Sequence, residues 1–419
     1  MKSATLGIVD IRRTISKFSS GQWPLFLLWA GAVGALIGMS VFLCSGWDAK
    51  DYVLAIRDYS SYTSGQQNSG LAYSPLFMIF AFGTASHLPI FLDEALFWVV
   101  YFLGFAAQLW VGGQFAEGAV ERKIIRYAAP VVAFFPGLLI SDAVLSGNVA
   151  YVIYGVILCT ALVGWKSENW NWFYLAVLGS TCVKFQMLTL VVIPLLSSKN
   201  RHWMRAVLTS AIATTLYAIQ PHIWPRAFRT YTNSLENMAL TRRDFGCGPI
   251  GNLARLLQDH GANYFGTCIA AYLLYASVLF LVLLFFAKQY REERITFAEW
   301  IPVMLLGVAL LNPRILTYDV AWVTLPMVLL AWRGLREPDG DRSTLIVFAA
   351  MLLGANVFVE FNEDFVHVLR DAWKYIEMII LLGIFCKSAM DLRAKVVVEE
   401  LEPMEAMPEP ERELVLELE

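Results

Sequence analysis

Two carboxylates follow directly on the first long apolar run of the sequence. The segment Trp47–Tyr52 contains Asp48 and Asp51, just after the apolar residues 24–45. A carboxylate within one turn of such a run is costly unless it is solvated or paired, so it is a candidate functional group. A positioned carboxylate can accept the proton of a hydroxyl nucleophile, which makes Asp48 the first candidate for a general base and Asp51 its alternative. Asp48 could equally cap the helix that follows it.

One lysine interrupts an apolar stretch near the middle of the chain. Lys184 lies between the apolar runs 173–183 and 187–196. Each run is too short to cross a membrane at full thickness without the residues around it. An ammonium group at membrane depth needs an anionic partner, which is either a protein carboxylate or a bound phosphate. Lys184 could instead extend its side chain to the membrane surface.

Two polar segments place arginines where a phosphate could bind. Arg243 lies in a long polar segment, and Arg314 lies in the turn Asn312-Pro313-Arg314 ahead of Tyr318. A guanidinium group binds phosphate through two parallel hydrogen bonds. The alternative is that these arginines pair with a nearby acid such as Asp244, which would have no consequence for function.

Two further segments combine polar and helix-breaking residues. Tyr73-Ser74-Pro75 opens a short apolar stretch, and the segment 141–148 ends in Gly147-Asn148. An aromatic hydroxyl or an amide at such a position can contact a bound ligand. Tyr73 could equally be an interfacial anchor, and Asn148 could belong to an ordinary turn.

The elements that position these residues are predicted to be membrane helices. The chain has 419 residues, of which 58% are hydrophobic and 16% charged, and this composition argues against a water-soluble fold. The sequence predicts an all-α polytopic bundle of about 12 transmembrane helices. The predicted spans are 24–45, 92–114, 126–141, 149–165, 170–183, 186–198, 204–222, 263–287, 298–312, 317–333, 344–360 and 372–390.

The distribution of Lys and Arg sets the expected sidedness. Basic clusters precede the first span and recur near residues 122–126, 166, 199–205, 288–294, 333–342 and 387–395. Positive charge near helix ends resists translocation, so we expect all these clusters and both termini to be cytoplasmic. This pattern requires that residues 75–91 form a re-entrant or interfacial helix instead of a crossing.

The predicted organisation is one membrane domain with two extensions. Residues 1–22 form a cytoplasmic segment and 23–392 the domain, which has outer loops 46–74 and 223–262. Residues 393–419 are rich in Glu and Pro, so we expect a disordered acidic tail. The six cysteines lack CxxC spacing, and we expect most of them to fill apolar helices. A pairing of Cys247 with Cys268 is the alternative.

The order of these motifs resembles glycosyltransferase family 87 of the GT-C superfamily. The resemblance covers most of residues 20–390 and depends on short motifs: Asp48 to Arg57, Tyr73-Ser74-Pro75, Gly147-Asn148, Lys184, and Asn312-Pro313-Arg314 with Tyr318. Ser74 departs from the family's Tyr-Pro-Pro pattern, because it replaces the first proline. The resemblance implies an inverting transferase that moves a hexose, most often mannose, from a polyprenyl phosphate sugar, with Asp48 as general base.

Chemistry supports such a donor. Nucleotide sugars are confined to the cytoplasm, so a transferase acting on the outer face needs a donor that arrives through the lipid. Lys184, Arg314 and Arg243 would stabilise the leaving phosphate. We expect Tyr73, Asn148, Tyr318 and Asp51 to line the substrate site.

These expectations extend to ligands and location. We expect no metal cofactor, a glycolipid or glycan acceptor, contact with membrane lipids and no nucleic acid. The expected location is a bacterial plasma membrane, with the site facing the periplasm or exterior. The alternatives are a transporter or flippase, a non-catalytic subunit, or a related enzyme that uses another sugar.

Overall fold

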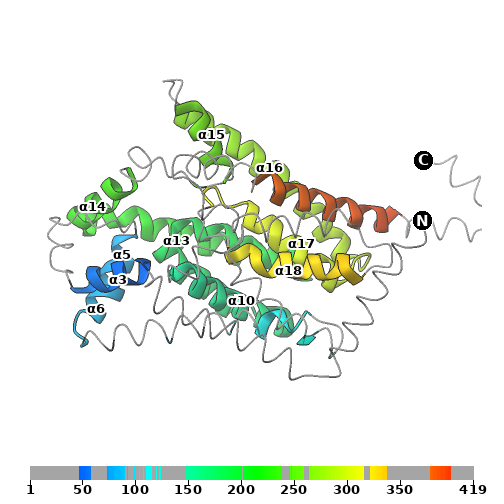
Figure 1. Ribbon diagram of the computed structural model, residues 1–419, viewed down its shortest axis with the longest axis horizontal. Helices are drawn as coiled ribbons and strands as arrows, with labels where there is room; N and C mark the ends of the chain where they lie inside the picture. The colour runs from blue at the N-terminus through cyan, green and yellow to red at the C-terminus, as the bar shows by residue number, and fades with distance from the viewer. Residues whose placement is uncertain are drawn as a thin grey trace, which may run out of the picture. The chain divides into compact units, whose positions relative to one another are not determined.

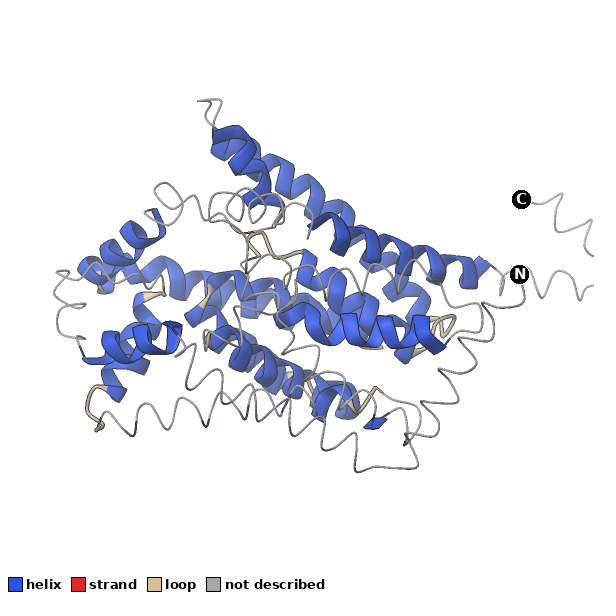
Figure 2. Ribbon diagram, in the orientation of Figure 1, coloured by secondary structure: helices blue, strands red, loops and turns tan. Residues whose placement is uncertain are grey.

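The computed structural model describes more than half of the chain, and all its regular elements are helices. It describes residues 47–57, 73–89, 92, 99, 103, 107, 110–115, 119, 122–123, 148–200, 202–236, 246, 248–258, 264–315, 321–336 and 378–397. Within these ranges there is no strand (Figure 2). The predicted all-α class is therefore confirmed for the described residues.

Figure 1 shows the described helices in chain order. Their bounds are α3 (Trp47–Arg57), α5 (Pro75–Phe77), the π-helix η2 (Met78–Phe82), α6 (Gly83–Ala85), α10 (Val149–Ser167), α11 (Asn171–Val183), the 3₁₀-helix η3 (Phe185–Val192), α12 (Ile193–Ser197), α13 (Trp203–Ile223), α14 (Pro225–Glu236), α15 (Pro249–Gln258), α16 (Tyr264–Arg291), α17 (Phe297–Leu310) and α18 (Ala321–Arg336). A last helix covers residues 378–397.

The chain divides into two compact units, each built from separate stretches of sequence. The first comprises Met1–Leu162, Gln220–Leu235 and Thr317–Phe361, and the second Val163–Ile219, Glu236–Leu316 and Asn362–Glu419. In the first unit, the ring of Tyr154 in α10 stacks on that of Trp322 in α18, and the Tyr154 hydroxyl donates to the Trp322 carbonyl oxygen at 2.6 Å. These contacts join α10 to α18.

Helix α17 is the core of the second unit. Every residue from Trp300 to Leu310 is buried, so this helix is apolar on all sides. It runs antiparallel to α16, because Tyr272 in α16 donates to the carbonyl oxygen of Leu311, whereas Phe286 contacts Trp300. Helices η3 and α12 pack on it as well. Gly307 allows the close approach, since a Cβ there would lie 2.6 Å from a methyl group of Leu283.

Helices α10 and α11 are held together by aromatic residues. Trp170 is completely buried and contacts Trp165 and Phe173 edge to face. Gly164 provides the space for its indole ring, because a Cβ on Gly164 would lie 2.5 Å from a ring carbon. The tight turn between the two helices therefore depends on a glycine.

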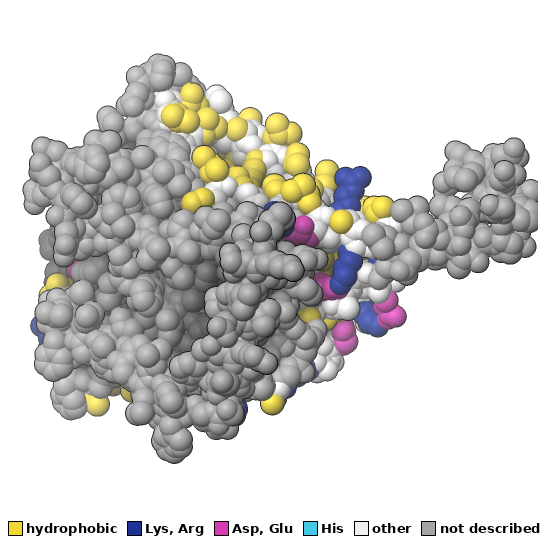
Figure 3. Space-filling view, turned by 45° about the vertical axis from the view of Figure 1, so that its right-hand side comes forward, with side chains coloured by type: hydrophobic (Ala, Val, Ile, Leu, Met, Phe, Trp, Pro, Cys, Tyr) yellow, Lys and Arg dark blue, Asp and Glu magenta, His cyan; other side chains and the backbone are white. Residues whose placement is uncertain are grey.

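Within the described residues, one helix is long and apolar enough to cross a membrane. It is Gly266–Arg291 within α16, and its window is only 17% buried. Hydrophobic side chains gather along the upper edge of the molecule in Figure 3, where Figure 1 places α15 and α16. The exposed apolar residues of α16 include Ile269, Leu273, Leu274, Val278, Leu281 and Phe285. The predicted bundle of twelve spans is not tested by a single helix and stays a prediction.

Several sequence-based boundaries can be compared with the structure. Helices α10, α11, α13, α16 and α17 each coincide with a predicted span to within a few residues. The predicted spans 24–45, 126–141 and 344–360, and most of 92–114, lie outside the described residues. The predicted outer loops are helical in part. Helix α3 lies in the loop 46–74, and helices α14 and α15, each of which begins at a proline, lie in the loop 223–262.

Two other features differ from the sequence-based expectation. The last helix extends to residue 397, beyond the predicted start of the tail at 393, because Leu392 and Val396 are buried one turn apart. Cys268 is a buried free thiol, which contradicts the alternative that it pairs with Cys247.

Candidate functional site

The hydroxyl of Tyr52 joins three predicted motifs in the first unit. It lies 2.5 Å from the hydroxyl of Tyr73, and it accepts a hydrogen bond at 3.3 Å from the backbone N–H of Val149, the residue after Asn148. The rings of Tyr52 and Tyr73 are buried, with 4% and 6% exposed, and tilt against each other at 5.6 Å. Segments far apart in sequence thus meet at one hydroxyl.

Asn148 caps the helix that follows it. Its side-chain Oδ1 accepts from the backbone N–H of Ala150 at 2.9 Å, and the side chain is buried. Such a contact satisfies one of the free N–H groups at the start of α10. Asn148 therefore fixes the turn that presents Val149 to Tyr52.

Helix α3 carries the two candidate carboxylates. Asp48 lies in its first turn and Asp51 one turn later, with Tyr52 four residues after Asp48. The side chain of Asp51 is exposed, and that of Asp48 lies outside the described part of the structure.

The segment after Tyr73 is a short helix that cannot cross a membrane. Pro75–Ala85 forms one continuous helical stretch, about 16 Å long at 1.5 Å per residue, against the roughly 30 Å of a bilayer core. Ser74 caps it through the N–H of Phe77, and Gln220 accepts from the N–H of Leu76 at 3.2 Å. The sequence analysis missed Gln220, although a polar side chain ahead of Pro221 in an apolar run was a usable signal.

The predicted break at Lys184 is present in the second unit. Helix α11 ends at Val183, and Lys184 is extended, with φ −133° and ψ 108°, before η3 begins. Its N–H donates to the carbonyl oxygen of Ser180, and its own carbonyl accepts from Met187, each at 2.9 Å. The side chain is half-buried.

The turn after α17 buries an amide with an unused donor. Asn312 is 1% exposed, and its Oδ1 accepts from the N–H of Arg314 at 3.1 Å. Its Nδ2 group is buried and donates to no described acceptor. A buried donor without an acceptor costs free energy, so this group is suited to an added ligand.

Glycines of the second predicted outer loop pack closely on this turn. A Cβ on Gly246, whose φ is +74°, would lie 2.5 Å from the carbonyl oxygen of Ile315, and one on Gly248 would lie 2.8 Å from its nitrogen. At Gly246 the left-handed backbone and the close approach together require glycine, and at Gly248 the close approach alone does. Gly246 and Gly248 thereby lie against the residues beside Arg314.

Lys184 and Asn312 lie at the same end of the second unit. The indole N–H of Trp300, near the start of α17, donates to the carbonyl oxygen of Leu196 in α12 at 2.9 Å. Since η3 precedes α12 and also packs on α17, it lies further along α17 toward Leu310. Lys184 precedes Leu196 by twelve residues, which is about 22 Å of helix. Asn312 follows Trp300 by twelve residues, which is about 18 Å of helix. Both residues therefore lie a similar length of helix away from the contact between Trp300 and Leu196.

The opposite end of this unit is polar and charged. The Lys199 ammonium pairs with Glu293 at 2.9 Å, which raises the pKa of Lys199 and lowers that of Glu293. Both side chains are exposed, so the pair adds little stability. The buried Ser198 hydroxyl donates to Glu168 at 2.7 Å and lies 3.2 Å from His202 Nε2. Burial of the imidazole is the main reason why the pKa of His202 lies below its ordinary value. The charge of Arg205 lowers this pKa as well, and that of Glu168 opposes the shift.

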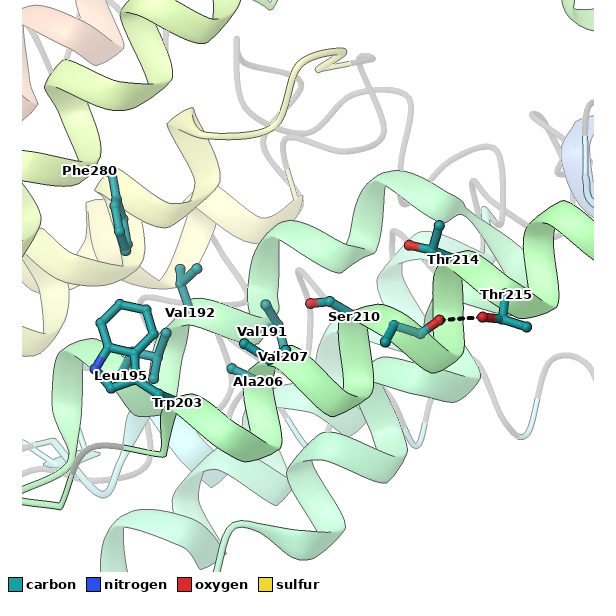
Figure 4. Close-up of a pocket in the computed structure, with 11 residues that line it drawn as sticks. Val191, Val192, Leu195, Trp203, Ala206, Val207, Ser210, Thr214, Thr215 and Phe280 are labelled. Atoms are coloured by element: carbon teal, nitrogen blue, oxygen red, sulfur yellow. Dashed lines mark hydrogen bonds between the residues drawn. The ribbon is translucent and has the colours of Figure 1, made fainter.

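An apolar pocket lies on the flank of the second unit, between these two ends. Its volume is about 620 Å³, and its lining comes from η3, α12, α13 and α16. Figure 4 shows Leu195 and Trp203 at one end of it and Thr214 at the other, with Phe280 facing them from α16. Polar groups at its wall include Ser210, and Thr215, whose hydroxyl donates to the carbonyl oxygen of Ala211.

The predicted site residues therefore fall into two groups. Tyr73, Asn148 and the helix that carries Asp48 and Asp51 are joined through Tyr52 in the first unit, while Lys184 and Arg314 share an end of the second. Arg243 and Tyr318 lie outside the described residues. The convergence of Asp48 with Lys184 and Arg314 stays a prediction.

The described residues include no cluster of three His, Cys, Asp or Glu side chains able to hold a metal ion. Comparisons with family models, with curated proteins and with solved structures find no match to this chain.

Proposed function

We propose that this protein is a polytopic membrane glycosyltransferase of about twelve spans that moves a hexose, mannose first, from a polyprenyl phosphate sugar to an acceptor hydroxyl with inversion. Asp48 is the base on the acceptor, and Lys184, Arg314 and Arg243 bind the donor phosphate at the non-cytoplasmic face. Transfer leaves the polyprenyl phosphate as the leaving group. The acceptor is a glycolipid or glycan.

The observation that carries the proposal is the layout of one helix. Lys184 stands at the start of η3, and Val191 and Val192 at its end line the apolar pocket, about 14 Å away at 2 Å per residue. A cation at one end and an apolar groove further along suit a ligand with an anionic head and a hydrocarbon chain. A polyprenyl phosphate sugar is such a ligand.

The turn at Asn312 supports the same ligand. Arg314 and the unused Nδ2 donor of Asn312 lie at the Lys184 end of the unit. An ammonium, a guanidinium and an amide donor together match the oxygens of a phosphate whose charge grows as the sugar leaves.

The test is to incubate the purified full-length protein with a panel of polyprenyl phosphate sugars and acceptors and to identify products by mass spectrometry. We expect one sugar to be transferred, and Asp48→Asn to abolish transfer while donor binding persists. Asp391→Asn, which removes an exposed carboxylate of the last helix, is the matched control and should be active. Activity in Asp48→Asn would show that the base is another residue.

The phosphate contact has its own test. Lys184→Ala should raise the KM for the donor roughly tenfold to a hundredfold, the value of a charge-assisted contact, and change the acceptor KM little. Lys199→Ala removes an exposed lysine at the other end of the unit and should leave both constants unchanged. Equal losses for donor and acceptor would contradict the assignment. Movement of a lipid-linked sugar across vesicles without any product would favour a flippase.

A further inference from the structure

Helix α14 has two chemically different faces. Ala227, Thr230 and Tyr231 are buried against the first unit, whereas Arg226 and Arg229 are exposed. The two arginines are three residues apart, so their guanidinium groups lie on one side of the helix. The result is a short basic stripe that faces away from the protein.

The position of this stripe is unfavourable for the isolated protein. The N-terminus of a helix carries partial positive charge, which favours acids and disfavours bases there. The first turn of α14 contains no acid, and neither Arg226 nor Arg229 forms an ion pair with a described residue. His222, in the last turn of the preceding helix, is also exposed. No acid in the first turn of α14 therefore offsets the positive charge at this helix start.

Exposed apolar and aromatic side chains lie beside the stripe. Ile223 is 51% exposed at the end of α13, and Phe80 is 63% exposed. The Phe80 ring contacts that of Trp224 edge to face at 6.2 Å, directly before α14 begins. Aromatic rings next to arginines are the composition of the membrane–water interface, where the rings enter the headgroup layer and the cations meet phosphates.

We propose that α14 is an interfacial helix that binds anionic phospholipid headgroups through Arg226 and Arg229, with Ile223, Trp224 and Phe80 seated among the lipids. Charge complementarity selects the occupant, because the first turn of α14 has no acid and the described neighbours Ile223, Trp224 and Phe80 are apolar or aromatic. The occupant also accounts for two arginines in a predicted outer loop, where positive charge is otherwise unfavourable.

The inference rests on the membrane placement given under Proposed function and not on sugar transfer. Its assay measures lipid binding alone. A protein that binds lipid in this way but transfers no sugar would leave the inference standing, and an active transferase without this binding would overturn it.

The experiment titrates the full chain in uncharged micelles with dioctanoyl phosphatidylglycerol, dioctanoyl phosphatidylcholine or inorganic phosphate. We expect the anionic lipid to bind best and Arg226→Gln/Arg229→Gln to weaken it about thirtyfold, which is about 2 kcal/mol for two basic side chains at an anionic surface. Arg226→Lys/Arg229→Lys keeps the charge and should retain most of the affinity. Equal binding of the two lipids, or of free phosphate and the anionic lipid, would overturn the proposal.

Hydrogen exchange locates the binding. In phosphatidylcholine nanodiscs, addition of phosphatidylglycerol should slow amide exchange in residues 225–236 of the wild type. The matched control is Arg122→Gln/Lys123→Gln, which removes two exposed cations elsewhere, and it should behave as the wild type. Unchanged slowing in Arg226→Gln/Arg229→Gln, or its absence in the wild type, would refute a role for α14.

Discussion

Removing the hydroxyl of Tyr52 breaks two hydrogen bonds at once. Tyr52→Phe removes the hydrogen bond shared with the Tyr73 hydroxyl and the one donated by the N–H of Val149, while the ring and its packing remain. A hydrogen bond contributes about 0.5–1.5 kcal/mol to stability, so we expect the loss of both to cost roughly 2–3 kcal/mol. Tyr73→Phe should cost only about 1 kcal/mol, because Tyr52 still accepts from Val149.

Two measurements test this order. Equilibrium denaturation in micelles gives the free energy of unfolding of both variants. Hydrogen exchange should show faster exchange at the amide of Val149 in Tyr52→Phe, with a smaller change at Ala150, whose amide donates to Asn148 instead. Equal losses for the two tyrosine variants, or an unchanged Val149 amide, would refute the view that one hydroxyl joins the three segments.

The remaining predictions concern the second unit. Gly164→Ala should cost about 1–3 kcal/mol of stability, because the added methyl group would overlap a buried indole ring. Gly179→Ala should stabilise α11 by up to about 1 kcal/mol, because a Cβ at Gly179 would have no atom within 4 Å. We expect the melting temperature to fall in the first variant and to rise in the second, and equal shifts would contradict this reasoning. Burial, followed by Arg205, lowers the pKa of His202 despite the opposing charge of Glu168. Its contribution to stability is thus complete above the unfolded pKa of about 6.5 and is lost as the pH falls through the lower folded pKa. Unfolding measured from about pH 8 to pH 5 should show this loss in the wild type and less of it in His202→Gln, and identical pH profiles would exclude the histidine.

Much of the local structure could be predicted from the sequence. Helices α10, α13 and α16 coincide with long apolar runs, because such runs satisfy their backbone groups internally and need no partner to define their length. The break at Lys184 was visible as a charge between two apolar runs. The distribution of positive charge, together with a proline near each end, predicted that residues 75–91 are not a crossing. The structure gives this segment a short helix that ends at Ala85, and its placement at the membrane stays a prediction.

Other local features were hidden by the search for membrane spans. Helices α14 and α15 lie in a predicted outer loop, since both are too short and too polar to be recognised by span length, although each starts at a proline. The sequence predicted that the tail begins at residue 393, whereas the last helix continues to residue 397. Leu392 and Val396 stand among charged residues in the sequence, so only their packing in the second unit reveals that they are buried.

The sequence by itself determined that the chain is apolar and helical, and which residue types interrupt its helices. Only the tertiary structure decided which segments meet: Tyr52 with Tyr73 and Val149, and α12 with the start of α17 through the Trp300 indole. The physical reason is that a helix is fixed by hydrogen bonds between near neighbours in the chain. The contacts between helices depend instead on individual side chains such as the Trp300 indole, which a pattern of hydropathy does not contain.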